Sequence, residues 1–431
     1  MAKRRTSQPA LELTEVGATQ KGPVECMGLH FDGEDARREH FTRLLAGKLK
    51  DPAFRQQAGF PQGTDVDILR MSDPPFYTAC PNPFLEDFVR CYGRPYDVAE
   101  PYQREPFAVD TSVGKTDALY KAHGYHTKVP HLAIVPSILH YTKPGDLVLD
   151  GFAGSGMTGV AAQWCGTAPA EYRKRVELHW KEEGRSKPLW GARRAILNDL
   201  GPAATFISAG YNLPFDHKAF TREALRLLAE TELELGWMYE TRHKDGRLGR
   251  INYTVWSEVF SCPECAAEVV FVEHAIERKT KRTKDTFPCP ECRTLLNKDS
   301  LERVFEARVD SATRQPWRRV SLKPVIINYR VGSKEYEKCP DAQDLATLAK
   351  IEGLGLPAGM PTVPLPLDQM YHGTRLGPKG FTHVHHLFLA RPACAMAALW
   401  RRAVQAALPN DRRQLLYFVE QAIWGLSVLA R

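Results

Sequence analysis

The sequence has no uninterrupted apolar run of the roughly 18 residues that a membrane-spanning helix needs. Its basic start, Met1 to Thr6, is not followed by an apolar segment, so we expect no secretory signal and a cytoplasmic protein. The excess of one charge sign is also small, because 58 basic and 51 acidic residues give a formal net charge of +7 over 431 residues. This balance permits a polyanionic partner without requiring one.

The composition excludes a mainly disordered or collagen-like chain, since 43% of the residues are hydrophobic and 25% are charged. The length predicts two to four domains of roughly 100–200 residues each. We expect an arm and a helix over 1–60, an α/β core over 61–245, a cysteine-rich ribbon with short strands over 246–345, and a linker with apolar helices over 346–431.

Hydrophobic periodicity and turn residues divide the chain further. The pattern predicts strands at 66–71, 147–150 and 195–199, short strands over 301–345, and an irregular connection over 77–127. It predicts helices at 34–50, 131–140, near 202, 217–235, 393–408 and 412–430, and a linker over 345–375.

A glycine-rich loop follows the predicted strand 147–150. Gly154, Gly156 and Gly159 satisfy the pattern G-x-G-x-x-G between that strand and a helix. Glycines let a ligand approach the backbone, and the helix start offers free N–H groups. The loop by itself fits a dinucleotide and S-adenosylmethionine equally well, and a tight turn without a ligand is the plain alternative.

Acidic and aromatic residues around this loop favour the methyl donor. Asp150 ends the strand, where a carboxylate can reach a cationic amino group. Phe152 lies within the loop, and binding of a pyrophosphate does not require an aromatic residue there. Asp199 ends the next strand and suits hydrogen bonding to a ribose diol. It lies 40 residues after Gly159, whereas a nicotinamide site places this acid only about 20 residues on.

A second motif is Asp73-Pro74-Pro75-Phe76, directly after the predicted strand 66–71. Such a corner presents a carboxylate, the carbonyl of Pro74 and an aromatic face. An exocyclic amine on a planar ring needs this set, because two acceptors hold its N–H groups while the ring stacks on Phe76. The plain alternative is a structural Asp-Pro-Pro turn.

Together these motifs resemble the amino-group DNA methyltransferases, and more narrowly the adenine-specific DNA methylases that contain a zinc ribbon. The longer string from Ser72 to Phe84 carries the resemblance, and His126 to Pro130 is similar to the family's motif that lines the methionine end of the cofactor. The resemblance implies a Rossmann-like α/β core, S-adenosylmethionine as cofactor, DNA as partner, and methyl transfer to the N6 amine of adenine. The implied cofactor residues are Lys128, Pro130, Asp150, Phe152, Gly154, Gly156, Thr158 and Asp199, and those holding the flipped base are Asp73, Pro74, Pro75 and Phe76.

Four of the ten cysteines form two Cys-Pro-Glu-Cys knuckles, Cys262/Cys265 and Cys289/Cys292, separated by 23 residues. This spacing predicts a structural Zn²⁺ bound by four thiolates.

Basic residues between the knuckles could follow nucleic-acid phosphates, with a solvated loop as the alternative; they are Arg278, Lys279, Lys281, Arg282 and Lys284. The group His383, His385 and His386 favours a polar turn over a metal site.

Two alternatives remain open. Corners of the Asp-Pro-Pro-Phe kind also resemble those of RNA and protein-amide methyltransferases. Only about 50 residues separate Phe76 from Lys128, and the chain ends inside an apolar helix. The protein could therefore be an incomplete nucleic-acid-binding half that needs a partner subunit or a missing C-terminal portion for activity.

Overall fold

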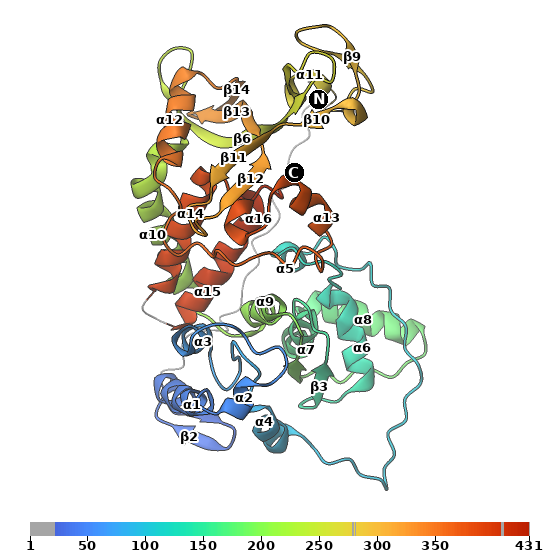
Figure 1. Cartoon of the computed structure of the whole chain (residues 1–431). Coiled ribbons are helices and arrows are strands. Elements are labelled where there is room, and N and C mark those ends of the chain that lie inside the picture. The colour runs from blue at the N-terminus through green and yellow to red at the C-terminus, as the bar shows by residue number, and fades with distance from the viewer. Residues whose placement is uncertain (1–21, 278–279, 281, 407–408, 431) are drawn as a thin grey trace. The chain divides into compact units, whose positions relative to one another are not determined.

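The computed structural model describes residues 22–277, 280, 282–406 and 409–430 (Figure 1). The chain divides into two compact units, each built from two separate segments. The first unit holds residues 1–224 and 405–421, and the second holds 225–404 and 422–431. Among the described helices, none is long and apolar enough to cross a membrane. The four segments expected from the sequence remain a prediction.

The first unit begins with a β-hairpin and short helices that share one core. The elements are β1 (Val24–Cys26), β2 (Leu29–Phe31), α1 (Glu34–Lys48), α2 (Pro52–Arg55), α3 (Asp65–Met71) and α4 (Leu85–Tyr92). Helix α1 packs on the hairpin and on α3. Their apolar sides meet in a core formed by Cys26, Phe41, Leu45, Leu49, Phe54, Ile68 and Phe84.

The strand predicted at 66–71 is wrong, because these residues form helix α3. Thr64 caps the helix by accepting a hydrogen bond from the Asp67 N–H at 3.2 Å, and Asp65 and Asp67 lie in the first turn, where the helix dipole favours negative charge. Only Ile68 of the alternating apolar residues is buried, while Val66 is exposed. The Asp73 corner therefore follows a helix.

A parallel α/β element follows in the first unit. Its parts are α5 (Ala118–Lys121), α6 (His131–Tyr141), β3 (Leu147–Asp150), α7 (Met157–Thr167), α8 (Ala170–Glu182), β4 (Arg194–Leu197) and α9 (Pro202–Asn212). Strands β3 and β4 pair in parallel, with Asp150 opposite Leu197. Helix α7 packs on β4, α6 and α9. The strands expected at 147–150 and 195–199 and the helices expected at 131–140 and near 202 are confirmed, as is a mixed α/β architecture. The connection expected to be irregular over 77–127 contains the short helices α4 and α5.

This parallel sheet is small. Within the part of the chain that the structure describes, it contains β3 and β4 and no third strand. Leu149 in the middle of β3 is 72% exposed, although parallel sheets are normally covered on both faces. One face of the sheet is therefore open in the described structure.

The second unit is built on an antiparallel sheet. Helix α10 (His217–Leu235), which starts in the first unit, leads into it through the 3₁₀ turn η1 (Gly236–Tyr239). The strands are β5 (Glu240–Arg242), β6 (Leu248–Ser261), β7 (Glu268–Val270), β10 (Glu302–Arg303), β13 (Leu322–Val331) and β14 (Lys334–Lys338), in the order β10-β6-β13-β14, with β5 and β7 also paired to β6. Two small hairpins join them, β8 (Phe287–Pro288) with β9 (Leu295–Leu296) and β11 (Phe305–Val309) with β12 (Pro316–Val320).

Helices complete both units near the C-terminus. The prediction of a linker over 345–375 is wrong for its first part, because those residues belong to helix α12 (Ala342–Glu352), which Asp341 caps. Further elements are α11 (Phe271–Ala275), α13 (Gly373–Leu376), η4 (Val384–Leu387) and α14 (Ala390–Val404). In place of the single helix predicted at 412–430, the structure has two helices, α15 (Pro409–Glu420) and α16 (Ala422–Leu426). Helix α15 belongs to the first unit and α16 to the second.

Replacement of Thr64 by alanine tests the identity of α3. Loss of the cap hydrogen bond should destabilise the helix by about 1 kcal/mol, whereas Thr64→Ser should retain most of it. Amide hydrogen exchange over residues 65–71 should accelerate in the alanine variant only. Equal protection in both variants would contradict a capped helix at this position.

Candidate functional site

The glycine-rich loop joins β3 to α7 and requires glycine at Gly156. This residue is the N-cap of α7 with φ of +78°, a left-handed conformation. A Cβ atom there would lie 2.2 Å from Oγ of Ser208 on α9. At Gly154, with φ of +51°, a Cβ would lie 2.9 Å from the Tyr125 ring. The glycines thus let the loop lie directly against its neighbours.

Two carboxylates fix the conformation of this loop. Oδ2 of Asp199 accepts the Gly154 N–H at 2.9 Å, and its Oδ1 accepts the Gly201 N–H at 2.9 Å. Oδ1 of Asp150 accepts the Phe152 N–H at 3.1 Å, and its Oδ2 accepts the Thr158 hydroxyl at 2.5 Å. Each carboxylate can accept about four hydrogen bonds, so both retain capacity for a ligand.

Aromatic and aliphatic side chains surround these carboxylates. Phe152 is 86% exposed, and Leu200 directly after Asp199 is also exposed. Tyr125 lies against Gly154, and its pKa is raised by desolvation and by the nearby negative charge of Asp199. Sequence reasoning missed Tyr125, because it stands in the long connection over 77–127. Its position just before the His126-to-Pro130 motif was the available signal.

Lys128 is held by the segment that precedes it and by α9. Its ammonium donates to the backbone carbonyls of Tyr120 at 2.7 Å and His123 at 3.1 Å, and to the Tyr211 hydroxyl at 2.8 Å. Burial lowers its pKa to about 8. All three N–H donors have protein partners, so Lys128 joins the Tyr120 segment to α9. Pro130 is buried as the N-cap of α6.

The corner residue Asp73 is buried among three arginines of the first unit. Its Oδ2 accepts from Arg413 at 2.7 Å, and its Oδ1 accepts from Arg37 at 3.2 Å and Arg38 at 3.3 Å. Burial alone would raise the pKa of this carboxyl, but the guanidinium charges outweigh burial and lower it. Asp73 is therefore ionised and connects α1 to α15.

Arg37 donates to the Asp73 carboxylate and the Pro74 carbonyl, the two acceptors that the sequence predicts for a base amine. One Nη1–H donates to the Pro74 carbonyl at 2.6 Å, Nη2 reaches Asp73, and the guanidinium lies 4.9 Å from the centre of the Phe76 ring. Glu34 fixes the same guanidinium through hydrogen bonds of 3.0 and 2.5 Å. Only 2% of Arg37 is exposed, whereas Phe76 is 46% exposed.

The corner and the glycine loop are connected through α9. Helix α15, whose Arg413 binds Asp73, packs on α9, which begins just after Asp199, and Gln414 of α15 donates to the Gly210 carbonyl of α9 at 3.2 Å. At the other end of α9, Nη2 of Arg413 donates to the Pro214 carbonyl at 3.1 Å. The two motifs thus belong to one unit and share this helix as a support.

The four knuckle cysteines converge in the second unit. Sγ of Cys262 lies 3.8 Å from Sγ of Cys292, and Sγ of Cys265 lies 3.7 Å from Sγ of Cys289. A tetrahedral ion with metal–sulfur bonds of about 2.3 Å has an edge of about 3.8 Å between ligands. The sulfur positions therefore match the size of a tetrahedral metal site.

Asp310, His385 and His386 form a second buried group. Both imidazole Nε2 atoms lie near Oδ2 of Asp310, at 2.8 Å for His385 and 2.6 Å for His386. The N–H groups of Thr382 and His383 donate to Nδ1 of His386, so its proton is on Nε2 and is donated to Asp310. These hydrogen bonds hold the three side chains together, and the same group could also hold a metal ion. The polar turn favoured by the sequence stays a prediction.

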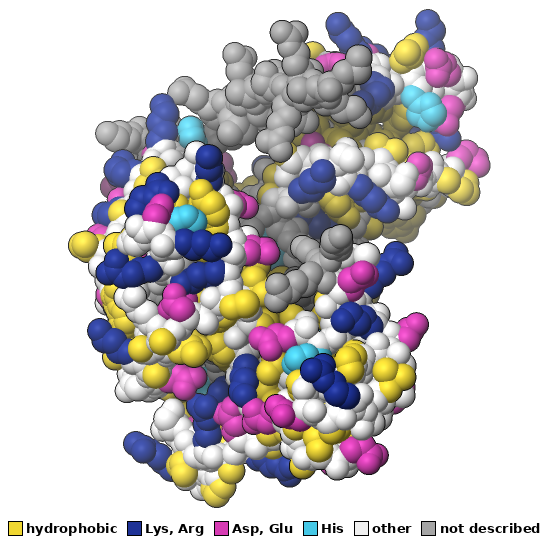
Figure 2. All heavy atoms as spheres, turned by 90° about the horizontal axis from the view of Figure 1, so that it is seen from above, with side chains coloured by type: hydrophobic (Ala, Val, Ile, Leu, Met, Phe, Trp, Pro, Cys, Tyr) yellow, Lys and Arg dark blue, Asp and Glu magenta, His cyan; other side chains and the backbone are white. Residues whose placement is uncertain are grey.

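Of the basic residues between the knuckles, Arg282 and Lys284 are described and exposed, whereas Arg278, Lys279 and Lys281 lie outside the described residues. On the face shown in Figure 2, Lys and Arg side chains are scattered among acidic and neutral ones. The described residues on that face form no continuous basic stripe.

Comparison with known proteins identifies one segment of the chain. Residues 101–167 match a family model described as DNA methylase, whose label covers N6 and N4 methyltransferases. The segment contains Lys128, β3, the glycine-rich loop and α7. This match confirms the resemblance to the amino-group DNA methyltransferases and supports an enzyme that methylates DNA. The searches of curated proteins and of solved structures found no match.

The Asp73 ion cluster predicts a specific acid sensitivity. A carboxyl whose pKa is lowered by folding stabilises the protein above its unfolded pKa of about 3.9, and this contribution is lost as the pH falls through the folded-state value. Asp73→Asn should cost roughly 3–5 kcal/mol at pH 7, because it leaves buried arginines uncompensated. The difference from wild type should shrink below about pH 4.

Urea unfolding of both proteins at pH 7 and pH 3 measures this difference. Asp87→Asn is the control, since Asp87 is 53% exposed and pairs with Arg90 on the surface; it should change stability little at either pH. A difference for Asp73→Asn that stays constant with pH would contradict an ionised, arginine-bound Asp73.

Proposed function

We propose that the protein is a DNA methyltransferase that transfers a methyl group from S-adenosylmethionine to the N6 amine of adenine, on a Rossmann-like core. The observation that carries this proposal is the glycine-rich loop held between Asp150 and Asp199, inside the segment that matches DNA methylases. The match alone covers N4 of cytosine as well. The adenine assignment rests on the resemblance of the motifs from Ser72 to Phe84.

The residues around the loop fit the proposed cofactor. Asp150 and Asp199 retain acceptor capacity for an ammonium group and a ribose diol, and Phe152 and Tyr125 offer apolar faces for a purine. Gly154 and Gly156 let the loop pack against Tyr125 and α9, and Thr158 orients Asp150. When bound, S-adenosylmethionine supplies the methyl group. The resemblance also assigns Lys128 and Pro130 to the cofactor site, and Lys128 fixes the segment just before Tyr125 through the Tyr120 and His123 carbonyls.

The Asp73–Phe76 corner is our proposed site for the target base. Asp73 and the Pro74 carbonyl accept hydrogen bonds from Arg37, a planar donor that lies over Phe76. An adenine amine presents the same N–H donors on a planar ring, so it competes with Arg37 for the same acceptors. The proposal therefore requires Arg37 to withdraw when the base enters, while Arg413 and Arg38 keep Asp73 ionised.

We also propose that the four knuckle cysteines hold one structural Zn²⁺, because their sulfur spacing fits a tetrahedral ion. Residues of the loop between the knuckles, including Arg282 and Lys284, would contact DNA phosphates. Neither Cys262 nor Cys289 is exposed. The metal would therefore stabilise the fold of the ribbon.

An incomplete active unit is a second candidate, favoured by one observation. The open face of the β3–β4 sheet exposes Leu149, and a partner polypeptide that packs on this face would bury it, as the faces of parallel sheets normally are. In this case the isolated chain binds S-adenosylmethionine but transfers no methyl group until the partner is added.

Substitution in the loop and at the corner tests the methyltransferase proposal. Asp199→Asn should weaken S-adenosylmethionine binding roughly 10- to 100-fold, because a hydrogen bond to a charged group contributes about 1.5–3 kcal/mol. Asp73→Asn should retain cofactor binding but lose transfer. Calorimetric titration and transfer of labelled methyl to adenine in DNA measure the two steps.

Asp110→Ala, in an exposed loop, is the matched control and should behave as wild type. Transfer to RNA or to protein acceptors in preference to DNA would contradict the DNA assignment. Failure of the wild-type protein to bind S-adenosylmethionine would contradict the proposal as a whole.

Metal analysis tests the ribbon. The purified protein should contain about one zinc per chain, and Cys289→Ser should release it and unfold the region around β8 and β9. Cys339→Ser is the control, because Cys339 is exposed and lies outside the cluster; this variant should keep the zinc content of wild type. Four freely titrating thiols at the knuckles of untreated protein would exclude the site.

A further inference from the structure

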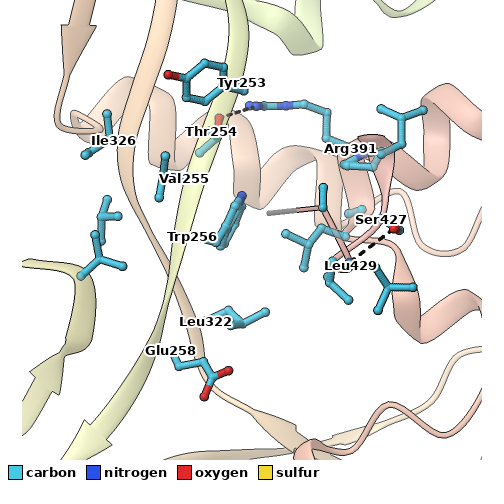
Figure 3. Close-up of a pocket in the computed structure, with 18 of the residues that line it drawn as sticks. Tyr253, Thr254, Val255, Trp256, Glu258, Leu322, Ile326, Arg391, Ser427 and Leu429 are labelled. Atoms are coloured by element: carbon cyan, nitrogen blue, oxygen red, sulfur yellow. Dashed lines mark hydrogen bonds between the residues drawn. The ribbon is translucent and has the colours of Figure 1, made fainter. Parts of the chain in front are cut away.

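The second unit contains a large cavity outside the proposed methyl-transfer site. It has a volume of about 1240 Å³ and lies between the β6–β13 sheet and the segments of α14 and residues 424–430 (Figure 3). Apolar side chains form much of its wall, among them Val255, Trp256, Leu322, Ile326 and Leu429. In Figure 3 the Trp256 ring points into the open space between β6 and Leu429.

One buried cation faces this cavity. Arg391 is only 8% exposed, and its Nη1 donates to the Thr254 hydroxyl at 3.3 Å, which Figure 3 shows as a dashed line. Its Nε is buried and has no hydrogen-bond partner among the described residues. The edge of a guanidinium that carries Nε and one Nη is the edge that binds a carboxylate through two parallel hydrogen bonds. In the described structure, this edge of Arg391 makes no such contact.

The charge of Arg391 is poorly compensated. No described carboxylate forms an ion pair with it, and the closest acidic influence, Asp344, is bound to Thr241 at 2.6 Å and Lys338 at 2.8 Å. The Arg391 guanidinium also lies 5.5 Å from the centre of the Tyr239 ring. Burial of a cation without an anion destabilises the protein, so the arrangement needs a reason outside the stability of the fold.

The location of Arg391 on α14 adds to this imbalance. It stands in the first turn of a 15-residue helix, where the positive end of the helix dipole disfavours a cation and favours an anion. A bound anion would therefore interact with the guanidinium and with the helix start together. At the other end of the cavity, Glu258 is paired with Lys379 and Arg303 and offers no free charge.

We propose that this cavity binds a small amphipathic carboxylate, with its head group on Arg391 at the start of α14 and its apolar body along Trp256, Leu322 and Leu429. A cavity of this size accommodates a body of drug-like or fatty-acyl dimensions. The proposal does not depend on the methyltransferase function, since all of these residues lie in the second unit.

Calorimetric titration of the full chain with dodecanoate tests the proposal. Wild type should bind dodecanoate, and Arg391→Gln should weaken binding by at least about tenfold, as expected for loss of a charged hydrogen-bond donor. Arg391→Lys should bind with intermediate affinity, because lysine keeps the charge without the planar fork. Arg401→Gln is the matched control on the same helix, where Arg401 pairs with Glu234 on the surface, and it should bind as wild type.

Further probes identify the head group and the body. Dodecanol should bind more weakly than dodecanoate, and dodecyl phosphate binding would show that the head-group site accepts either anion. Without ligand, Arg391→Gln should unfold at the same or a higher temperature than wild type, which excludes misfolding as the cause of its weak binding. Equal affinity of wild type and Arg391→Gln for dodecanoate, no binding by wild type, or binding of adenosine monophosphate in place of dodecanoate would overturn the proposal.

Discussion

The hydrogen bonds of the Asp199 carboxylate are the constraint on which the proposed cofactor site depends. They connect the glycine-rich loop after β3 to the start of α9 after β4, so that one side chain fixes both strand ends. Asp150 fixes the same loop from the other side through Thr158 and Phe152. Because these bonds use only part of the capacity of each carboxylate, a rigid loop and two available acceptors occur at the same place.

The Asp73 corner is held by a different kind of force, a buried cluster of opposite charges. Arg37 comes from α1 and Arg413 from α15, 340 residues after Asp73. Three guanidinium groups keep the carboxylate ionised, which suits a residue that orients an amine through its negative charge. They also fill its acceptors, so the proposed binding of a base at this corner would be an exchange of donors and not the filling of an empty pocket. Under this proposal, occupancy of the corner depends on the affinity of the base relative to that of a neighbouring arginine.

Local features could be predicted from the sequence. The glycine-rich loop, β3, α6 and the two cysteine knuckles are encoded within a few residues, so their positions agree with expectation. Helix α3 was predicted as a strand, because alternating apolar residues concealed the cap at Thr64 and the acidic first turn. Arg37, Arg413 and Tyr125 could not be assigned, since their partners are set by tertiary contacts. The unpaired Arg391 likewise depends on the packing of α14 beside β6, which periodicity does not reveal.

Photochemical crosslinking tests the central claim most directly, because it locates the cofactor without relying on activity. Ultraviolet irradiation of the protein with radiolabelled S-adenosylmethionine, followed by peptide mapping, should place the label on the peptides that contain Tyr125 or residues 150–159. An excess of unlabelled S-adenosylhomocysteine should prevent it. Label confined to peptides of the second unit, or incorporation that the competitor does not reduce, would contradict a cofactor site at the glycine-rich loop.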